Sequence, residues 1–282
     1  MNTNVKWNLD PFPYLVIDNF LGKDQFDALS LELDQTHNLL QSKFQTPLES
    51  KSIYKDTLSK EASHNLVQLM GSDKIKNIIA QETGDSEIIS MADNEAFGGY
   101  SPYHITNNNG FLGTHVDHSF VDEGRLRHMA NTIFYASSKW EKNWGGQTIF
   151  YSKNGFTQEI LIDPLPNRLV FFIHTANSFH GVSNYISDED VERRTFYHDY
   201  YVSESNIKNV MDNVNKNRAS KLQHFFHGTT FVPFIPFGIN NLDFKKLFNS
   251  KNIKYIPVYL AYLCNRLLGT RIVSIRKIFK LK

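Results

Sequence analysis

A histidine and an aspartate two residues apart are the most suggestive pair in this sequence. They lie in the segment FLGTHVD at residues 111–117. In an extended segment side chains alternate between two faces, so His115 and Asp117 would point to the same side. An imidazole and a carboxylate held on one face can bind a single divalent metal ion. The pair is therefore a candidate for two ligands of a metal site.

A third ligand could come from the second half of the chain. Residues 168–184, RLVFFIHTANSFHGVSN, combine an apolar strand with a histidine in a turn of small residues. Two histidines and one carboxylate would form a facial triad, which leaves open positions and is typical of non-haem Fe(II) oxygenases. Residues 193–201, RRTFYHDYY, add arginines. Their planar guanidinium groups suit the binding of a carboxylate.

The elements that must position these residues begin with a mainly helical region. Apolar residues recur there at helical spacing, and cap residues mark the helix ends. We expect a strand at 11–20, a helix through Phe26, Leu29 and Leu33, a loop at 35–55, a helix from the Asp56–Thr57 cap to Met70, and a helix from Ser72 to Gly84.

From residue 87 the pattern changes to short extended runs separated by Gly, Asn, Asp and Pro. Such punctuation indicates a β-sandwich or barrel, and eight runs suit a jelly roll. We therefore predict an α+β fold with a mainly β core, a cupin-like double-stranded β-helix at about 87–203, in a domain spanning 1–203. Residues 204–282 would form a C-terminal extension. The expected strands are 87–92, 100–106, 111–117, 128–136, 147–151, 157–162, 168–174 and 193–202.

Composition is that of a globular protein, with 41% hydrophobic and 21% charged residues. The single cysteine, Cys264, excludes an intramolecular disulfide and suits a reducing compartment. There is no signal-peptide pattern and no apolar run of the roughly 20 residues that a membrane span needs. We expect a cytoplasmic protein. It could be peripheral at the membrane because of its basic C-terminal end.

Residues 244–282 hold ten Lys and Arg and no Asp or Glu, which leaves 20 basic and 29 acidic residues elsewhere, a balance of −9. The last residues, TRIVSIRKIFKLK, could form a basic amphipathic helix. Such a helix could contact an anionic membrane surface, an acidic partner, a second subunit or the acidic body of the protein itself. No nucleic-acid motif accompanies it, so nucleic acid is not an expected partner.

Taken in order, the segments PFPYLVIDNFL, GFLGTHVDHS, NWGGQTIFY, DPLPNRLVFFIHTANSFHGV and RRTFYHDYY resemble the prolyl-4-hydroxylase-like branch of the Fe(II)/2-oxoglutarate dioxygenases. The resemblance covers residues 10–203. It implies that His115, Asp117 and His180 are the catalytic iron ligands. It also implies 2-oxoglutarate and O2 as co-substrates, with ascorbate as a possible supporting reductant. We expect His174 to be structural, because its strand should end before the metal site.

The resemblance also suggests which residues bind 2-oxoglutarate. Its far carboxylate would be bound by Arg193, which shares a strand face with Thr195, or by the neighbouring Arg194. Strand alternation lets only one of these arginines point inward, and we favour Arg193. The further candidates are Tyr135, Asn131 and Tyr103. His118 is a candidate for the mouth of the substrate site.

The expected reaction is hydroxylation of an unactivated C–H bond in a peptidyl proline or other amino-acid residue, with release of succinate and CO2. Two alternatives remain open at this point. The protein could be a tailoring oxygenase that acts on a glycan, lipid or metabolite precursor. It could also be a non-catalytic cupin-like binding protein.

Overall fold

The computed structural model describes residues 6–35, 41–45, 49–54, 60–93, 101–118, 120–121, 125–151, 158–175, 178–189, 191–206 and 230–231. In this part of the chain fourteen strands form one hydrogen-bonded sheet, in which all the pairings are antiparallel. The strands are β1 Tyr14–Ile17, β2 Gln41–Gln45, β3 Glu49–Tyr54, β4 Ile89–Ser90, β5 Tyr103–Thr106, β6 Gly110–Val116, β7 Phe120–Val121, β8 Leu126–Tyr135, β9 Thr148–Tyr151, β10 Gln158–Ile162, β11 Arg168–Ile173, β12 His180–Tyr185, β13 Arg193–Ser203 and β14 Thr230–Phe231.

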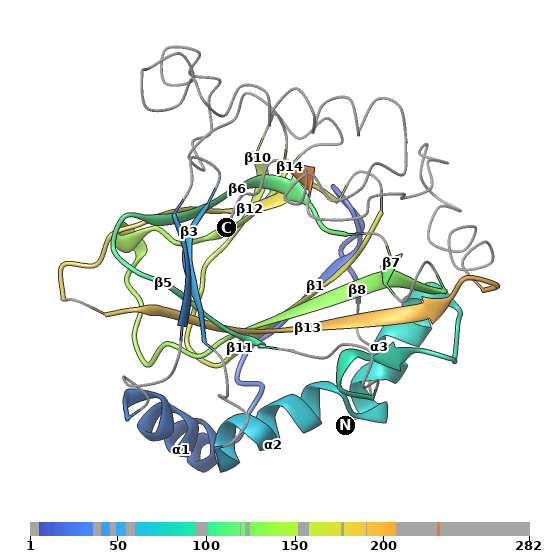
Figure 1. The fold of residues 1–282 in the computed structure, drawn as a ribbon, viewed down its shortest axis with the longest axis horizontal. Helices are drawn as coiled ribbons and strands as arrows, with labels where there is room; N and C mark the ends of the chain where they lie inside the picture. The colour runs from blue at the N-terminus through green and yellow to red at the C-terminus, as the bar shows by residue number, and fades with distance from the viewer. Residues whose placement is uncertain are drawn as a thin grey trace.

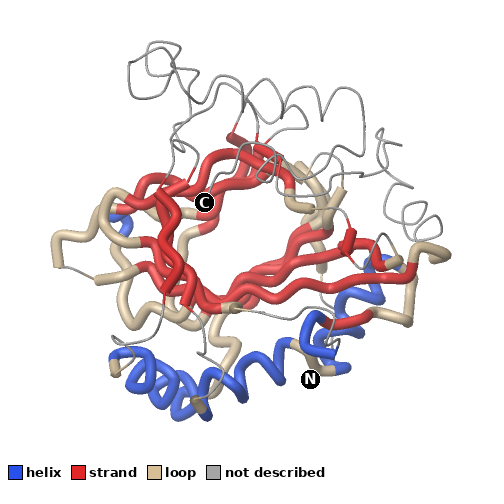
Figure 2. The backbone as a smooth tube through the Cα atoms, viewed as in Figure 1, coloured by secondary structure: helices blue, strands red, loops and turns tan. Residues whose placement is uncertain are grey.

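The sheet curls so that its two halves face each other (Figures 1 and 2). One wall has the order β1-β11-β8-β13, and the opposite wall has the order β6-β12-β9-β10. Strands β5 and β3 connect the walls on one side. The fold is therefore a jelly roll, as the sequence predicted, and the space between its walls is where the candidate residues of β6, β12 and β13 can meet.

Three helices, α1 Lys23–Asp34, α2 Glu61–Met70 and α3 Asp73–Thr83, cover the outer side of the wall that contains β8 and β13 (Figure 1). Strand β11 is buried on both faces, which explains its continuous apolar run. Leu169, Phe171 and Ile173 belong to the core shared with the helices, whereas Val170 and Phe172 join a second core with Phe12 and Phe150. This packing places β11 between two apolar layers.

Several expectations from the sequence are confirmed, and others are wrong. Helix α3 follows Ser72 and ends at Gly84, whose φ of 74° is the left-handed conformation of a C-cap. The loop expected at 35–55 instead contains strands β2 and β3. The hairpin was missed because it is polar: Glu49, Lys51 and Ile53 alternate toward a pocket rather than toward an apolar core.

Three further differences concern the bounds of the predicted elements. Helix α2 begins at Glu61, and the predicted cap at Asp56–Thr57 lies outside the described residues. His180, expected in a turn, is the first residue of strand β12. The run expected at 87–92 contains only the two-residue strand β4.

Strand β14 belongs to the predicted C-terminal extension, yet it pairs with β6 at Val116 and His115. The basic segment 244–282 lies outside the described residues, so its contacts with a membrane, an acidic partner or a second subunit stay predictions. None of the helices in the described part of the chain has the length and apolar character needed to span a membrane.

Candidate active site

Strand register brings the predicted metal ligands together. Strands β6 and β12 pair antiparallel, and His180 lies directly opposite His115. Cross-strand neighbours on one face lie within side-chain contact, and Asp117 follows two residues after His115 on that face. The close pairing depends on Gly181, where a Cβ atom would lie 2.7 Å from the Leu112 carbonyl oxygen.

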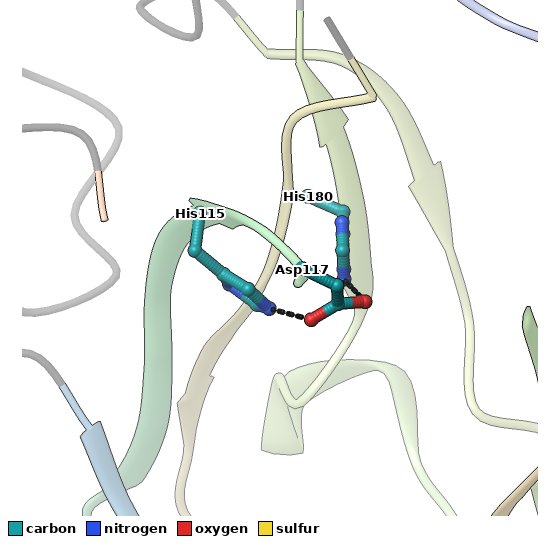
Figure 3. A group of neighbouring side chains, drawn as sticks. All are labelled: His115, Asp117 and His180. Carbon is teal, nitrogen blue, oxygen red and sulfur yellow. Dashed lines mark ion pairs between the residues drawn. The ribbon is translucent and has the colours of Figure 1, made fainter. Parts of the chain in front are cut away.

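The three side chains converge on one point (Figure 3). The Nε2 atoms of His115 and His180 each lie 3.3 Å from an oxygen of Asp117. Nδ1 of His115 faces the Gly113 carbonyl oxygen at 2.8 Å, and Nδ1 of His180 faces the Ser178 carbonyl oxygen at 2.9 Å. Because a carbonyl can only accept, both Nδ1 atoms donate, and in the neutral rings both Nε2 atoms then present a lone pair.

This arrangement fits a metal ion. Two imidazole lone pairs and a carboxylate face one another in a buried position, and Oδ2 of Asp117 has no hydrogen-bond partner among the described residues. Main-chain carbonyls that fix the ring orientation are the usual support of metal-binding histidines. Burial would raise the pKa of Asp117, but the adjacent His180 and His115 outweigh it and hold the pKa well below its usual range.

A pocket with a volume of about 270 Å³ contains these three residues and extends between the walls. Arg193 lines it and is only 4% exposed. Its Nε donates to the Gly146 carbonyl oxygen at 2.7 Å, and its Nη2 donates to Oγ1 of Thr148 at 3.2 Å. No carboxylate of the described residues forms an ion pair with it. Arg193 thus offers a buried, oriented cation in the same pocket as the triad.

Arg194 points the other way. It forms ion pairs with Asp34 at 2.5 Å and with Glu192 at 3.2 Å, and it does not line the pocket. The alternation expected of a strand therefore separates the two arginines, and Arg193 is the one that faces inward.

Of the other candidates, Thr195 and Asn131 line the pocket. Tyr135 does not, but its hydroxyl donates to Oγ1 of Thr148 at 2.6 Å and its ring lies 5.3 Å from the Arg193 guanidinium. Tyr135 therefore orients the groups around the arginine. Tyr103 is not brought to the pocket: it belongs to the core beneath the helices, stacked on Phe196.

Gly145 and Gly146, in the segment NWGGQTIFY, also serve Arg193. Gly146 has a φ of 75°, which favours glycine, and a Cβ atom there would lie 3.0 Å from Cδ of Arg193. Gly146 places its carbonyl oxygen against the guanidinium while leaving room for the arginine stem.

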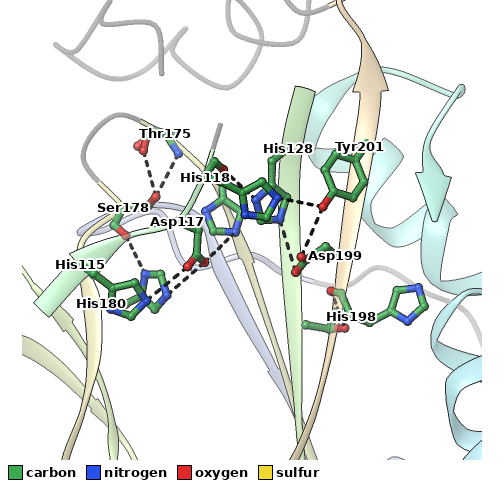
Figure 4. A network of polar contacts seen from close by, with 12 residues as sticks. His115, Asp117, His118, His128, Thr175, Ser178, His180, His198, Asp199 and Tyr201 are labelled. Atoms are coloured by element: carbon green, nitrogen blue, oxygen red, sulfur yellow. Dashed lines mark hydrogen bonds and ion pairs between the residues drawn. The ribbon is translucent and has the colours of Figure 1, made fainter. Parts of the chain in front are cut away.

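A second histidine cluster, which the sequence did not reveal, lies beside Asp117 (Figure 4). His118, His128 and Asp199 each offer a ligand atom, and these atoms lie within 4.8 Å of one another. His118 and Asp199 line the pocket. Burial, and next His128, lower the pKa of His118 to about 4, whereas Asp199 overcomes the effect of burial on His128 and raises its pKa. The clue in the sequence was the alternation of Arg193, Thr195, Tyr197 and Asp199 along one strand face.

The sequence of residues 100–198 matches the family model of the 2OG-Fe(II) oxygenase superfamily. Residues 100–198, which include the triad and Arg193, thus belong to a 2OG-Fe(II) oxygenase domain. The predicted class of enzyme is thus confirmed, and with it Fe(II) and 2-oxoglutarate as the cofactor and co-substrate. None of the curated proteins matches the sequence.

Solved structures that are similar to this chain include two prolyl hydroxylases. A prolyl-4-hydroxylase from Pseudomonas putida is 20% identical, with a TM-score of 0.48, and the match covers 70% of this chain and 95% of that chain. A prolyl hydroxylase from Trichoplax adhaerens, in complex with a hypoxia inducible factor peptide fragment, is 17% identical, with a TM-score of 0.48 and coverage of 70% and 86%. HygX from Streptomyces hygroscopicus, with nickel and 2-oxoglutarate bound, is 11% identical, with a TM-score of 0.43 and coverage of 66% and 82%.

Proposed function

We propose that this oxygenase hydroxylates an unactivated C–H bond, with His115, Asp117 and His180 holding Fe(II) and Arg193 binding the far carboxylate of 2-oxoglutarate. One observation carries the proposal. The pocket that contains the triad also contains a buried arginine for which the described residues supply no carboxylate partner. An acidic co-substrate would supply that partner.

The triad supports iron through its donor set. The two Nε2 lone pairs and one Asp117 oxygen are the two-histidine, one-carboxylate combination that leaves positions open for other ligands. When bound, Fe(II) supplies, with 2-oxoglutarate and O2, the oxidation that hydroxylates a substrate and releases succinate and CO2. The residues of the chain position the ion and the co-substrate.

Arg193 suits the far carboxylate for three reasons. A guanidinium can donate two parallel hydrogen bonds to a carboxylate, which a lysine cannot. Its Nε and one Nη already donate to Gly146 and Thr148, so the group is oriented before the co-substrate arrives. Burial strengthens the attraction between the two charges, because the local dielectric is low.

For the substrate we propose a peptidyl proline or another amino-acid residue. A polar small molecule is the second candidate, because the wall formed by β3 brings Glu49 and Lys51 into the pocket, with 3.3 Å between their charged groups. Charged side chains in a pocket wall suit a substrate that carries hydroxyl, amine or carboxylate groups. A panel of proline-containing peptides and polar metabolites, assayed for consumption of 2-oxoglutarate, distinguishes these two classes.

The test of the proposal is release of succinate from 2-oxoglutarate by the metal-stripped protein after addition of Fe(II) and ascorbate. We expect iron-dependent succinate in the wild type and in His64→Ala, which changes an exposed histidine of α2. We expect none in His180→Ala. If no substrate of the panel gives turnover and the anaerobic Fe(II) protein does not bind 2-oxoglutarate, the non-catalytic alternative replaces this proposal.

A further inference from the structure

The second histidine cluster, formed by His118, His128 and Asp199, resembles the triad in the placement of its potential metal-ligand atoms. Nδ1 of His128 faces the carbonyl oxygen of His118 at 3.0 Å, so this nitrogen carries the proton and donates it. In the neutral ring, Nε2 of His128 then presents its lone pair toward Oδ1 of Asp199, which lies 3.5 Å away. In the triad the corresponding separation between Nε2 and the Asp117 oxygens is 3.3 Å.

Two buried acceptors that face each other need a proton or a metal ion between them. His128 is 3% exposed and Asp199 is 4% exposed. Nε2 of His128 and Oδ1 of Asp199 have no hydrogen-bond partner among the described residues. A buried acceptor without a partner costs roughly 1–3 kcal/mol, and more when it is charged. The described side chains therefore leave both Nε2 of His128 and Oδ1 of Asp199 without a hydrogen bond.

A proton shared by His128 and Asp199 is the simplest completion, but the geometry suits it poorly. The separation of 3.5 Å is longer than the 2.7–2.9 Å of a charge-assisted hydrogen bond. A metal ion bound by two ligands at about 2.0–2.2 Å each holds the two ligand atoms roughly 3–3.5 Å apart, which matches the spacing found here. His118 then provides the third ligand, from the residue next to Asp117.

We propose that His118, His128 and Asp199 bind a second divalent transition-metal ion, separate from the iron of the triad. Two imidazoles and one carboxylate favour borderline ions such as Zn²⁺ over Mg²⁺ or Ca²⁺, which prefer oxygen ligands. The hydroxyl of Tyr201 lies 2.9 Å from Nε2 of His118 and orients that ring. Because His118 and Asp199 line the same pocket as the triad, a substrate could reach the second ion.

The experiment is a count of bound zinc. The full-length protein is stripped of metal, dialysed anaerobically against excess Zn²⁺, and analysed for zinc per chain by mass spectrometry. We expect two ions in the wild type, one in His128→Ala, one in Asp199→Asn, one in His180→Ala and none in the His128→Ala/His180→Ala double variant. His64→Ala is the matched control for loss of a histidine and keeps two.

Asp199→Asn guards against a folding artefact, because the Asn amide can donate to Nε2 of His128 and satisfy it without a metal. Far-UV circular dichroism checks each variant. One zinc ion in the wild type, lost only in His180→Ala, would overturn the second site. Two ions that persist in both His128→Ala and Asp199→Asn would overturn it as well. Loss of the ion in His180→Ala bears on the triad alone, so the two sites fail independently.

Discussion

The two adjacent arginines of β13 allow a sharp test of how 2-oxoglutarate is bound. Arg193→Met keeps much of the side-chain stem and removes the guanidinium. Arg193 is buried, with 4% of the residue exposed. Arg194→Met makes the same change one residue later. There the guanidinium pairs with Asp34, whose side chain is 58% exposed, and with Glu192. The two variants differ only in the face of the strand that they alter.

The expected magnitudes follow from burial. Removing one partner of a buried, hydrogen-bonded charge pair costs roughly 2–5 kcal/mol. At about 1.4 kcal/mol per factor of ten, the Kd for 2-oxoglutarate should rise by roughly 30-fold to several thousand-fold in Arg193→Met. Ion pairs near the surface contribute roughly 0–1 kcal/mol, so Arg194→Met should lose only that much stability and keep its affinity for 2-oxoglutarate.

The assay is anaerobic titration of the Fe(II) protein with 2-oxoglutarate, followed by calorimetry, with thermal unfolding of each variant as the check on folding. Arg193→Lys refines the result, because lysine keeps the charge but loses the fork that reaches Gly146 and Thr148. Its affinity should lie between the wild type and Arg193→Met. Unchanged affinity in Arg193→Met, or a larger loss in Arg194→Met, would refute the assignment.

Three further changes test the supporting structure. Gly146→Ala forces a side chain into a φ of 75° and against the Arg193 stem, so 2-oxoglutarate affinity should fall about tenfold and stability by about 1 kcal/mol. The control is Gly22→Ala, where the nearest atom to the added Cβ lies at 3.4 Å; calorimetry and thermal unfolding should show no change in affinity or stability. Tyr135→Phe removes the bond to Thr148 and should weaken 2-oxoglutarate binding by a few-fold in the same titration. Asp18 has a pKa lowered by its hydrogen bond from Arg168, so its stabilisation is present above the unfolded pKa of about 3.9 and is lost as pH falls through the folded value. Asp18→Asn should therefore lower stability by less than about 1 kcal/mol at pH 7 and by nothing near pH 2, in denaturant titrations at both pH values.

The sequence predicted those parts of the fold whose signal is local. The apolar run of β11 and the glycine that ends α3 could be read directly, because burial and backbone conformation select residue types at single positions. Strand β3 could not, because its inward face lines a polar pocket and so lacks the apolar alternation by which strands are recognised. A strand that serves the site is therefore harder to predict than a strand that serves the core.

The candidate site shows the same limit at the level of single histidines. His115 and Asp117 are two residues apart, and a period of two is enough to place them together. His128 and Asp199 are brought together only by the register of β8 against β13, which includes a shift between Tyr200 and Tyr201. That irregularity places His128 opposite Tyr201, whereas regular alternation from Ala130 would pair it with Val202. The sequence contains the potential metal-ligand residues of both clusters, but the second cluster forms only when the sheet brings its residues together.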